Sequence, residues 1–309
     1  MLNMDQKLIK RQAEGKIINT GIVGAGQMGR GMTTQMVLMN GIKPAVVSDI
    51  VVENAVHAFE YAGVAKEDIA VCNTVAEANA ALEAGKYVAT ADSNIVTQAD
   101  AVEVVVDVTG VPDVGAKVST DAMDNGKHVV MMNVETDVVI GPYLKKYAEQ
   151  KGVLYTGSAG DEPGAVMELY CFAKAMSMNV EVMGKGKNNK LDYDCNPDTV
   201  LEEATRRKMS PKMLCAFKDG TKTMVEMTAM SNYTGLVPDV IGGHGPETAP
   251  GTEGIKQLND IFKLKEDGGI LNKHGVVEYV NGVAPGVFVT VSTPNDEIAY
   301  QMGYHSMGP

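Results

Sequence analysis

Tryptophan is absent from this chain of 309 residues, and there are only 5 phenylalanines and 4 cysteines. No CxxC pair and no zinc-type spacing occurs among the cysteines, which are Cys72, Cys171, Cys195 and Cys215. A disulfide scaffold and a zinc module are therefore not indicated. No apolar run approaches the roughly 18 residues of a membrane span, and residues 1–15 lack the apolar core of a signal peptide. We expect a reduced, cytoplasmic protein that has no membrane partner.

Positive charge is also scarce, with 27 Lys and Arg against 39 Asp and Glu and a formal net charge of -12. This balance argues against nucleic-acid partners, because affinity for polyphosphates comes from clustered Lys and Arg. Any small anionic ligand must then meet a local basic site. Hydrophobic residues make up 45% of the chain, enough for a packed core. The 20 methionines are interpreted first as core filling.

Apolar β-branched runs alternate with helical stretches from about residue 16 to 156, after an N-terminal helix over residues 2–14. Such alternation predicts an α/β fold, a Rossmann-type doubly wound parallel sheet covered on both faces. Gly41, Gly126 and Gly152 each follow a helical stretch, as C-terminal caps do. Residues 65–100 exceed a minimal crossover, and we interpret them as an insertion between the two halves of the sheet.

The second half of the chain mixes helices with alternating strands, which predicts a smaller α+β domain. We therefore divide the chain into residues 1–156, a dinucleotide-binding domain with the N-terminal helix, and residues 157–309. The second domain is expected to bind substrate, to carry catalysis and to form a homo-oligomer.

The segment GAGQMG, Gly24 to Gly29, lies between a predicted strand and a helix, and Asp49 closes the next strand. In this context Gly24 permits a tight turn, Gly26 lets the backbone approach a pyrophosphate, and Gly29 allows the helix to pack on the strand. Asp49 would accept the ribose hydroxyls of NAD and repel a 2′-phosphate, and Arg30 could soften that repulsion. The cofactor-binding set also includes two residues of the helix start, Gln27 and Met28.

Two further segments end predicted strands of the same sheet. Thr109 and Gly110 in DVTG, and Asn133 and Glu135 in MMNVETD, would face the ligand crevice at the carboxyl ends of the strands. Glu135 is a candidate catalytic residue, and the other three are candidates for cofactor binding. A plain turn for DVTG and a helix-capping role for MMNVETD are open alternatives.

Three segments of the second half carry chemistry. Asp161 and Glu162 are both reasonable caps for the helix that follows. Alternatively, one of them lies in the substrate site, where it could bind a sugar hydroxyl, a metal or a transferring proton. The segment GKGKNNK predicts a phosphate or carboxylate clamp formed by Lys185, Lys187, Asn188 and Asn189, unless it is a solvated basic loop.

The third of these segments is SPKMLCAFKDGTKTMVEMTAMSNYTG. Asp219 and Lys222, with Glu226 one turn further on, have the spacing of one helix face. They form either a surface ion-pair stripe or a catalytic lysine held by carboxylates, with Lys222 as acid, base or carbonyl polariser and Asp219 orienting it. The histidines do not indicate a metal site, and we expect no bound metal.

The order GAGQMGRG, DVTG, MMNVETD, GDEPG, GKGKNN and FKDGTKTMVEM resembles the homoserine-dehydrogenase-like oxidoreductases. The resemblance is closest to the deoxyxylulose-phosphate reductoisomerase-like branch and spans nearly the whole chain. It implies an NAD(P)-dependent enzyme that acts on a small, often phosphorylated polyol, keto-sugar or amino-alcohol. Asp219 and Lys222 look similar to the catalytic Asp and Lys of homoserine dehydrogenases, although the spacing differs.

That branch continues into a C-terminal module of the antifreeze-like (SAF) type, which we expect this chain, ending in MGYHSMGP, to lack. Members of the branch are associated with NADPH whereas Asp49 favours NAD, so the predicted cofactor is NADP or NAD. The leading hypothesis is hydride transfer to or from a keto-sugar or polyol held between the domains, with or without prior skeletal isomerisation. A homoserine-type dehydrogenase and a non-catalytic dinucleotide sensor are the alternatives.

Overall fold

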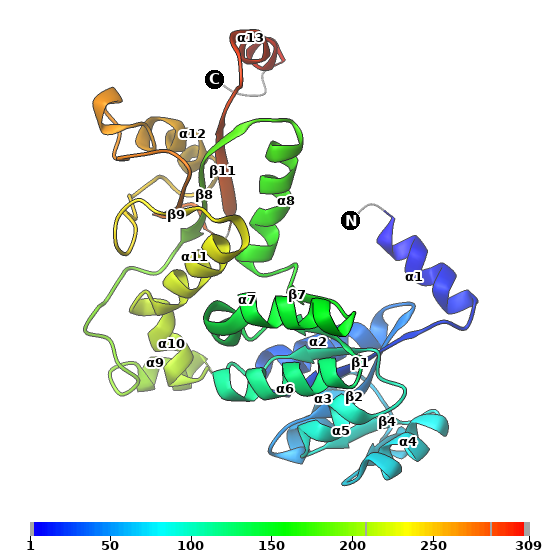
Figure 1. The fold of residues 1–309 in the computed structure, drawn as a ribbon. Helices are drawn as coiled ribbons and strands as arrows, with labels where there is room; N and C mark the ends of the chain where they lie inside the picture. Colours follow the sequence, from blue (N-terminus) through cyan, green and yellow to red (C-terminus); the bar gives the residue numbers. More distant parts are fainter. Residues whose placement is uncertain (1–2, 208, 285, 306–309) are drawn as a thin grey trace. The chain divides into compact units, whose positions relative to one another are not determined.

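The computed structural model describes residues 3–207, 209–284 and 286–305, and the chain divides into two compact units, Met1–Ser158 and Ala159–Pro309 (Figure 1). The first unit alternates helices with short strands. Its elements are α1 (Met4–Ala13), β1 (Ile18–Val23), α2 (Gln27–Leu38), β2 (Ile42–Ser48), α3 (Val52–Tyr61), η1 (Lys66–Asp68), β3 (Ile69–Val71), α4 (Val75–Glu83), β4 (Tyr87–Thr90), α5 (Ser93–Gln98), β5 (Val104–Asp107), α6 (Pro112–Asp124), β6 (His128–Met131), α7 (Val134–Lys151) and β7 (Tyr155–Gly157).

The seven strands of the first unit form one parallel sheet in the order β3-β4-β2-β1-β5-β6-β7. The chain order reverses at β1, between β2 and β5, so the expected doubly wound α/β class is confirmed. The interpretation of residues 65–100 as an insertion is wrong. This stretch supplies β3 and β4, and β4 pairs directly with β2, because its short apolar strands continue the sheet.

The sheet of the first unit is buried on both faces. Neighbouring residues of β2 point to opposite sides, and Val46 joins a core formed with α5, α6 and α7. Val47 joins a second core with Phe59 of α3 and with α2. Successive residues of a strand point to opposite faces of the sheet. A strand in a sheet that is covered on both faces therefore needs apolar residues at every position and not only at alternate ones.

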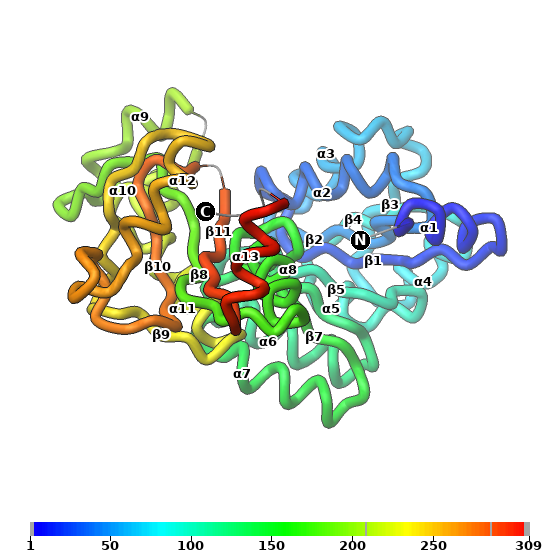
Figure 2. Tube along the Cα trace, turned by 90° about the horizontal axis from the view of Figure 1, so that it is seen from above, coloured from blue at the N-terminus to red at the C-terminus, as the bar shows by residue number. Residues whose placement is uncertain are grey.

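The second unit is built on a smaller mixed sheet. Its elements are α8 (Glu162–Ala175), β8 (Asn179–Lys187), α9 (Leu201–Arg207), α10 (Pro211–Lys218), α11 (Thr221–Thr234), β9 (Val237–Pro238), α12 (Gly251–Ile261), η2 (Lys265–Asp267), β10 (Val276–Asn281), β11 (Val287–Ser292) and α13 (Asp296–Tyr304). The order is β11-β8-β10-β9, with β11 antiparallel to β8 and the other pairs parallel. Figure 2 shows β8, β10 and β11 along the tube of the chain. The expected smaller α+β domain is confirmed.

Two cores flank this second sheet. One, on the side of α8 and α11, is rich in methionine and includes Met183, Met227 and Met230. The other packs Leu258 of α12 and Phe262, directly after that helix, against the opposite side. The methionines therefore act as core residues here, where a flexible thioether fills irregular space.

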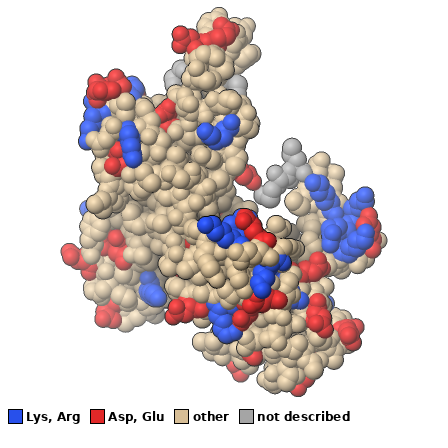
Figure 3. Space-filling view, in the orientation of Figure 1, with Lys and Arg blue, Asp and Glu red and all other residues tan. Residues whose placement is uncertain are grey.

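The charged surface is mixed on the face that Figure 3 shows, and Lys and Arg gather mainly around α1. The basic side chains of α1 include Lys7, Lys10 and Arg11, close in sequence to Glu14. Among the described residues, no helix combines the length and the apolar character that a membrane crossing requires.

Candidate functional site

The glycine-rich turn between β1 and α2 has the geometry of a dinucleotide loop. Gly24 has a φ of 101°, which favours glycine, and a Cβ there would lie 3.1 Å from the Val108 carbonyl carbon. A Cβ on Gly29 would lie 1.8 Å from the Gly24 carbonyl oxygen, so only glycine fits. A Cβ on Gly26 would meet nothing within 4 Å. The turn is therefore closed toward the protein and open at Gly26, as a phosphate-binding loop requires.

Asp49, directly after β2, is tied to this turn. Its Oδ2 accepts the backbone N–H of Ala25 at 2.8 Å, and its Oδ1 accepts the N–H of Val51 at 3.0 Å and the side-chain amide of Asn54 at 3.1 Å. A carboxylate has about four lone-pair sites, so both oxygens keep acceptor capacity for further donors. The structure thus brings Asp49 to Gly24–Gly29 as the fingerprint predicts.

Three predicted cofactor residues lie in the first turns of α2. Gln27 and Met28 are exposed, and their backbone N–H groups precede the first intrahelical bond, which runs from Arg30 to the Gly26 carbonyl. The exposed Arg30 guanidinium lies 4.9 Å from the centre of the Tyr61 ring, in cation–π contact. The free backbone N–H groups at the start of α2 and the Arg30 guanidinium are accessible and electropositive, so they suit an anionic cofactor.

Asn133 serves the protein interior, and its predicted role in cofactor binding is not supported by the geometry. Its side chain is 1% exposed and donates to Asp107 Oδ2 at 2.9 Å, while its Oδ1 accepts the N–H of Thr136 at 3.2 Å. Thr109 also turns inward, since its hydroxyl donates to Asp107 Oδ1 at 2.8 Å. The capping alternative therefore describes Asn133, because the buried Asp107 carboxylate needs these donors.

Gly110 and Glu135 lie close together beside this network. Gly110 has a φ of 65°, and a Cβ there would be 4.0 Å from Glu135 Oε2. Glu135 is half-buried in the first turn of α7, where a carboxylate also favours the helix dipole. Its catalytic role stays a prediction.

A buried charge network in the second unit joins residues from β8, α8 and α11. The Lys185 ammonium donates to Glu162 Oε1 at 2.8 Å and to Glu226 Oε2. The other oxygen of Glu226 lies 3.7 Å from Lys222 Nζ. Glu226 is 1% exposed and bridges the two lysines, while Lys222 keeps 19% of its side chain exposed. Lys222 is thus the more accessible of the two cations.

The electrostatics of this network favour the charged forms of Lys185 and Glu162, whereas burial opposes ionisation of Glu226. Burial opposes the Lys185 charge, but Glu226 and Glu162 outweigh burial and raise the pKa of Lys185. Burial likewise opposes ionisation of Glu162, yet the hydrogen bond from Lys185 lowers its pKa. Burial raises the pKa of Glu226 against the attraction of Lys185. Lys185 therefore stays charged and holds Glu162 as a carboxylate.

Asp161 extends the acidic side of the network. Burial raises the pKa of its carboxyl group against the attraction of Lys222, and its buried Oδ2 has no hydrogen-bond partner among the described residues. Asp161, Glu162 and Glu226 each place an oxygen within 4.8 Å of the others, a spacing that a cation could bridge. Because Lys185 already contacts two of these carboxylates, a metal would compete with its ammonium. The expected absence of a metal stays a prediction.

Asp219 does not share a helix face with Lys222, and that prediction is wrong. Asp219 is the residue that ends α10, and its Oδ1 accepts the N–H of Thr221 at 2.8 Å. Gly220, with a φ of 90°, separates it from α11. The left-handed glycine breaks the helix that the spacing assumed, and Asp219 acts as a local cap.

Most of the segment GKGKNNK is not a solvated loop, because β8 continues to Lys187 and the two lysines of that strand, Lys185 and Lys187, are buried, whereas Lys190 is exposed. The Lys187 ammonium donates to the Phe217 carbonyl at 2.7 Å, and burial, assisted by Lys185, lowers its pKa. Asn188 is exposed and Asn189 half-buried. An anion clamp stays a prediction, and both lysines already have internal partners.

Glu226 is the residue that sequence reasoning undervalued. It was noticed only as a possible member of an ion-pair stripe, yet it is the buried centre of the network. Its signal is a single acid four residues after Lys222, in a helix whose other buried residues are Thr223, Met227, Ala229 and Met230. A charge on the apolar face of a helix indicates a paired, buried group.

Comparison with protein families gives a match to the second unit. Residues 160–309 match the family model described as the catalytic domain of oxidoreductase DRL. This match supports the expected enzyme class, an NAD(P)-dependent oxidoreductase, and with it a nicotinamide cofactor, NAD or NADP. It does not show membership of the broader homoserine-dehydrogenase-like family. A comparison with curated proteins gave no significant match.

Solved structures with a similar fold are distant. The chain is 17% identical to the proposed oxidoreductase YvaA of Bacillus subtilis over 57% of this chain and 44% of that one, with a TM-score of 0.39. It is 14% identical to scyllo-inositol dehydrogenase of Lactobacillus casei, over 57% and 47%, with a TM-score of 0.39. A proposed myo-inositol dehydrogenase of Sinorhizobium meliloti 1021 is 12% identical over 88% and 71%, with a TM-score of 0.46. The chain thus spans under half the length of the first two, and none identifies a substrate.

Proposed function

We propose that the protein is an NAD(P)-dependent oxidoreductase that interconverts a carbonyl and an alcohol on a small keto-sugar or polyol. The observation that carries this proposal is the buried network of Glu162, Lys185, Glu226 and Lys222, which lies inside the region matched by an oxidoreductase catalytic domain. A lysine held by a buried carboxylate at the edge of such a network suits proton transfer to an oxygen.

In the reductive direction, Lys222 as an ammonium donates a proton to the carbonyl oxygen while the carbonyl carbon gains a hydride, and an alcohol forms. In the reverse direction the neutral amine takes the hydroxyl proton. Glu226 holds the Lys222 amine in position from 3.7 Å. Lys185 forms an ion pair with Glu226 in the interior, where an unpaired carboxylate would be destabilising. A bound nicotinamide dinucleotide supplies or accepts the hydride.

Asp161 suits recognition of a substrate hydroxyl, because its Oδ2 lacks a partner among the described residues. The ammonium groups of Lys185 and Lys187 are already committed to Glu162, Glu226 and the Phe217 carbonyl. These commitments favour an uncharged polyol or keto-sugar over a phosphorylated one. Dehydrogenation without skeletal rearrangement needs only the groups named above, and isomerisation stays the finer alternative.

A substrate panel tests this function. The full chain is mixed with NADH or NADPH and a series of keto-sugars, their phosphate esters and aspartate semialdehyde, and oxidation of the cofactor is followed by absorbance. We expect turnover with an unphosphorylated keto-sugar. Turnover of aspartate semialdehyde alone would favour a homoserine-type dehydrogenase, a product with a rearranged carbon skeleton would favour isomerisation, and cofactor binding without any turnover would favour the sensor.

The cofactor preference rests on Asp49, whose carboxylate is tied to the glycine turn at Ala25. We expect Asp49→Asn to lower the ratio of kcat/KM for NADH to that for NADPH by about tenfold, because removing one charge relieves repulsion of a 2′-phosphate while an amide oxygen can still accept from Ala25. Glu53→Gln, which changes an acid in the first turn of α3, is the control. An unchanged ratio for Asp49→Asn would remove Asp49 from cofactor selection.

A further inference from the structure

A cavity of about 220 Å³ lies in the second unit, on the side of the sheet opposite the lysine network. Phe262, directly after α12, lines it and belongs to the core on that side. The lysine network belongs to the side of α8 and α11, as Met183 and Met227 show. A single water needs only about 15 Å³ by this kind of measure, so the cavity has room for a small organic molecule.

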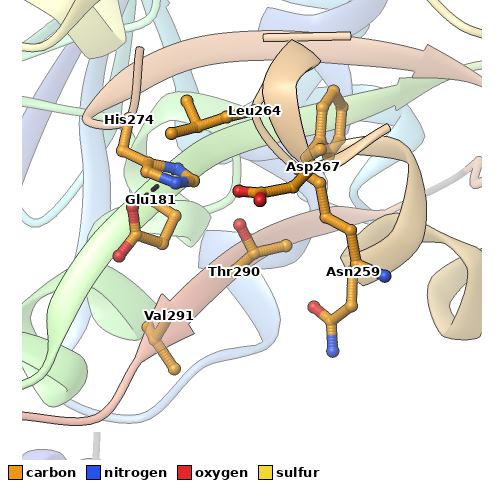
Figure 4. A pocket seen from close by; sticks show the side chains of 9 residues that line it. Glu181, Asn259, Leu264, Asp267, His274, Thr290 and Val291 are labelled. Carbon is orange, nitrogen blue, oxygen red and sulfur yellow. Dashed lines mark ion pairs between the residues drawn. The ribbon is translucent and has the colours of Figure 1, made fainter. Parts of the chain in front are cut away.

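The polar lining of the cavity is acidic. Figure 4 shows the side chains of Glu181, Asp267, His274 and Thr290 around the same space. His274 Nδ1 lies 2.7 Å from Glu181 Oε2, and the Ser292 hydroxyl donates to the other oxygen of Glu181. Among the residues that the structure describes, Asp267 forms no ion pair. Each carboxylate can accept further donors.

The charged side chains around the cavity indicate which classes of ligand it can bind. Lys263 also borders the cavity, and its ammonium pairs with Asp260 Oδ1 at 2.7 Å, so the carboxylates of Glu181 and Asp267 outnumber the one lysine of the lining. An anion is therefore disfavoured. A divalent metal is disfavoured too, since the described residues assemble a group of three metal-ligand side chains only at Asp161, Glu162 and Glu226.

The apolar part of the lining consists of Phe262, Leu264 and Val291. The Thr290 hydroxyl also belongs to the lining and is buried without a hydrogen-bond partner among the described residues, so it can pair with a polar group of a ligand. A ligand that combines a cationic group with a short carbon stem matches this division between acidic and apolar surface.

We propose that this cavity binds a small primary amine, whose ammonium group donates to Asp267 and Glu181 and whose carbon stem contacts Phe262, Leu264 and Val291. The site is separate from the proposed oxidoreductase chemistry and does not depend on it. Charge-assisted hydrogen bonds to carboxylates supply the selectivity for the ammonium group.

The test compares two ligands of equal size, 4-aminobutan-1-ol and butane-1,4-diol, by calorimetric titration of the full chain. We expect the amine to bind about tenfold more tightly than the diol, because only the amine carries a positive charge opposite to that of the two carboxylates. Equal affinity for the two would mean that the cavity recognises hydroxyl groups and would overturn the proposal. Failure of the amine to bind would overturn it as well.

Variants locate the binding. Asp267 is exposed at the rim, so Asp267→Asn should leave folding intact while weakening amine binding about tenfold and diol binding little. Its neighbour Glu266 is also exposed and does not line the cavity, so Glu266→Gln is a control with the same change of charge. Equal effects of the two substitutions would indicate general electrostatics and not this site.

Discussion

Replacing Lys222 by alanine is expected to lower kcat by about 10²–10⁴-fold, the usual contribution of a positioned acid or base. The reason is that Lys222 is the more accessible lysine of the network and the only one of the two without a hydrogen-bonded carboxylate at close range, its contact with Glu226 being 3.7 Å. The measurement is steady-state turnover on the substrate that the panel identifies.

Folding of the Lys222→Ala variant should persist, because Glu226 keeps its contact with Lys185. Lys212→Ala, which removes an exposed lysine from α10, is the matched control and should leave kcat unchanged. A variant at Lys222 that binds cofactor and retains kcat within twofold would show that Lys222 does not transfer the proton. A shifted pH profile in Lys222→Arg would separate proton transfer from a structural role.

The second large effect concerns stability. Lys185→Met should lower the free energy of unfolding by about 3–5 kcal/mol, since it leaves Glu226, 1% exposed, without its nearest cation. Adding Glu226→Leu should recover most of that loss, because an apolar pair of similar volume needs no compensation in the interior. Chemical denaturation of the full chain measures both.

Lys256→Met is the control, since Lys256 and Glu253 form an ion pair whose side chains are 67% and 70% exposed. Such surface pairs contribute little, so this variant should unfold close to the parent. If Lys185→Met is as stable as Lys256→Met, the Lys185–Glu226 contact is not the buried ion pair described above. If the free energy of unfolding falls only in the double variant Lys185→Met with Glu226→Leu, the packing of the two side chains and not their charges stabilises this contact.

The fold and the conformation of the glycine-rich turn could be predicted from the sequence because their determinants are local. Gly24, Gly26, Gly29 and Asp49 lie within one strand-helix-strand unit, where each spacing has a direct geometric meaning. The prediction from spacing was wrong at Asp219, because Gly220 separates this residue from the helix that contains Lys222. A periodic spacing does not reveal where a helix starts.

The lysine network could be predicted only in part. Lys185 and Glu226 are 41 residues apart and meet because β8 and α11 pack together, a contact that no spacing encodes. Asn133 shows a related limit, since a polar group after a strand serves equally well as a cap or as a ligand. The buried Asp107 decides between them by requiring donors, and its burial becomes evident only in three dimensions.

The bond between Asp49 and the Ala25 N–H has a consequence for the energetics of cofactor capture. This bond and the close packing around Gly24 and Gly29 belong to the fold itself, so we expect the turn to lose its conformational entropy during folding and not during association. Ordering a flexible loop would otherwise subtract from affinity. Capture of the cofactor should therefore proceed as a rigid-body encounter, with an association rate limited by orientation rather than by loop closure.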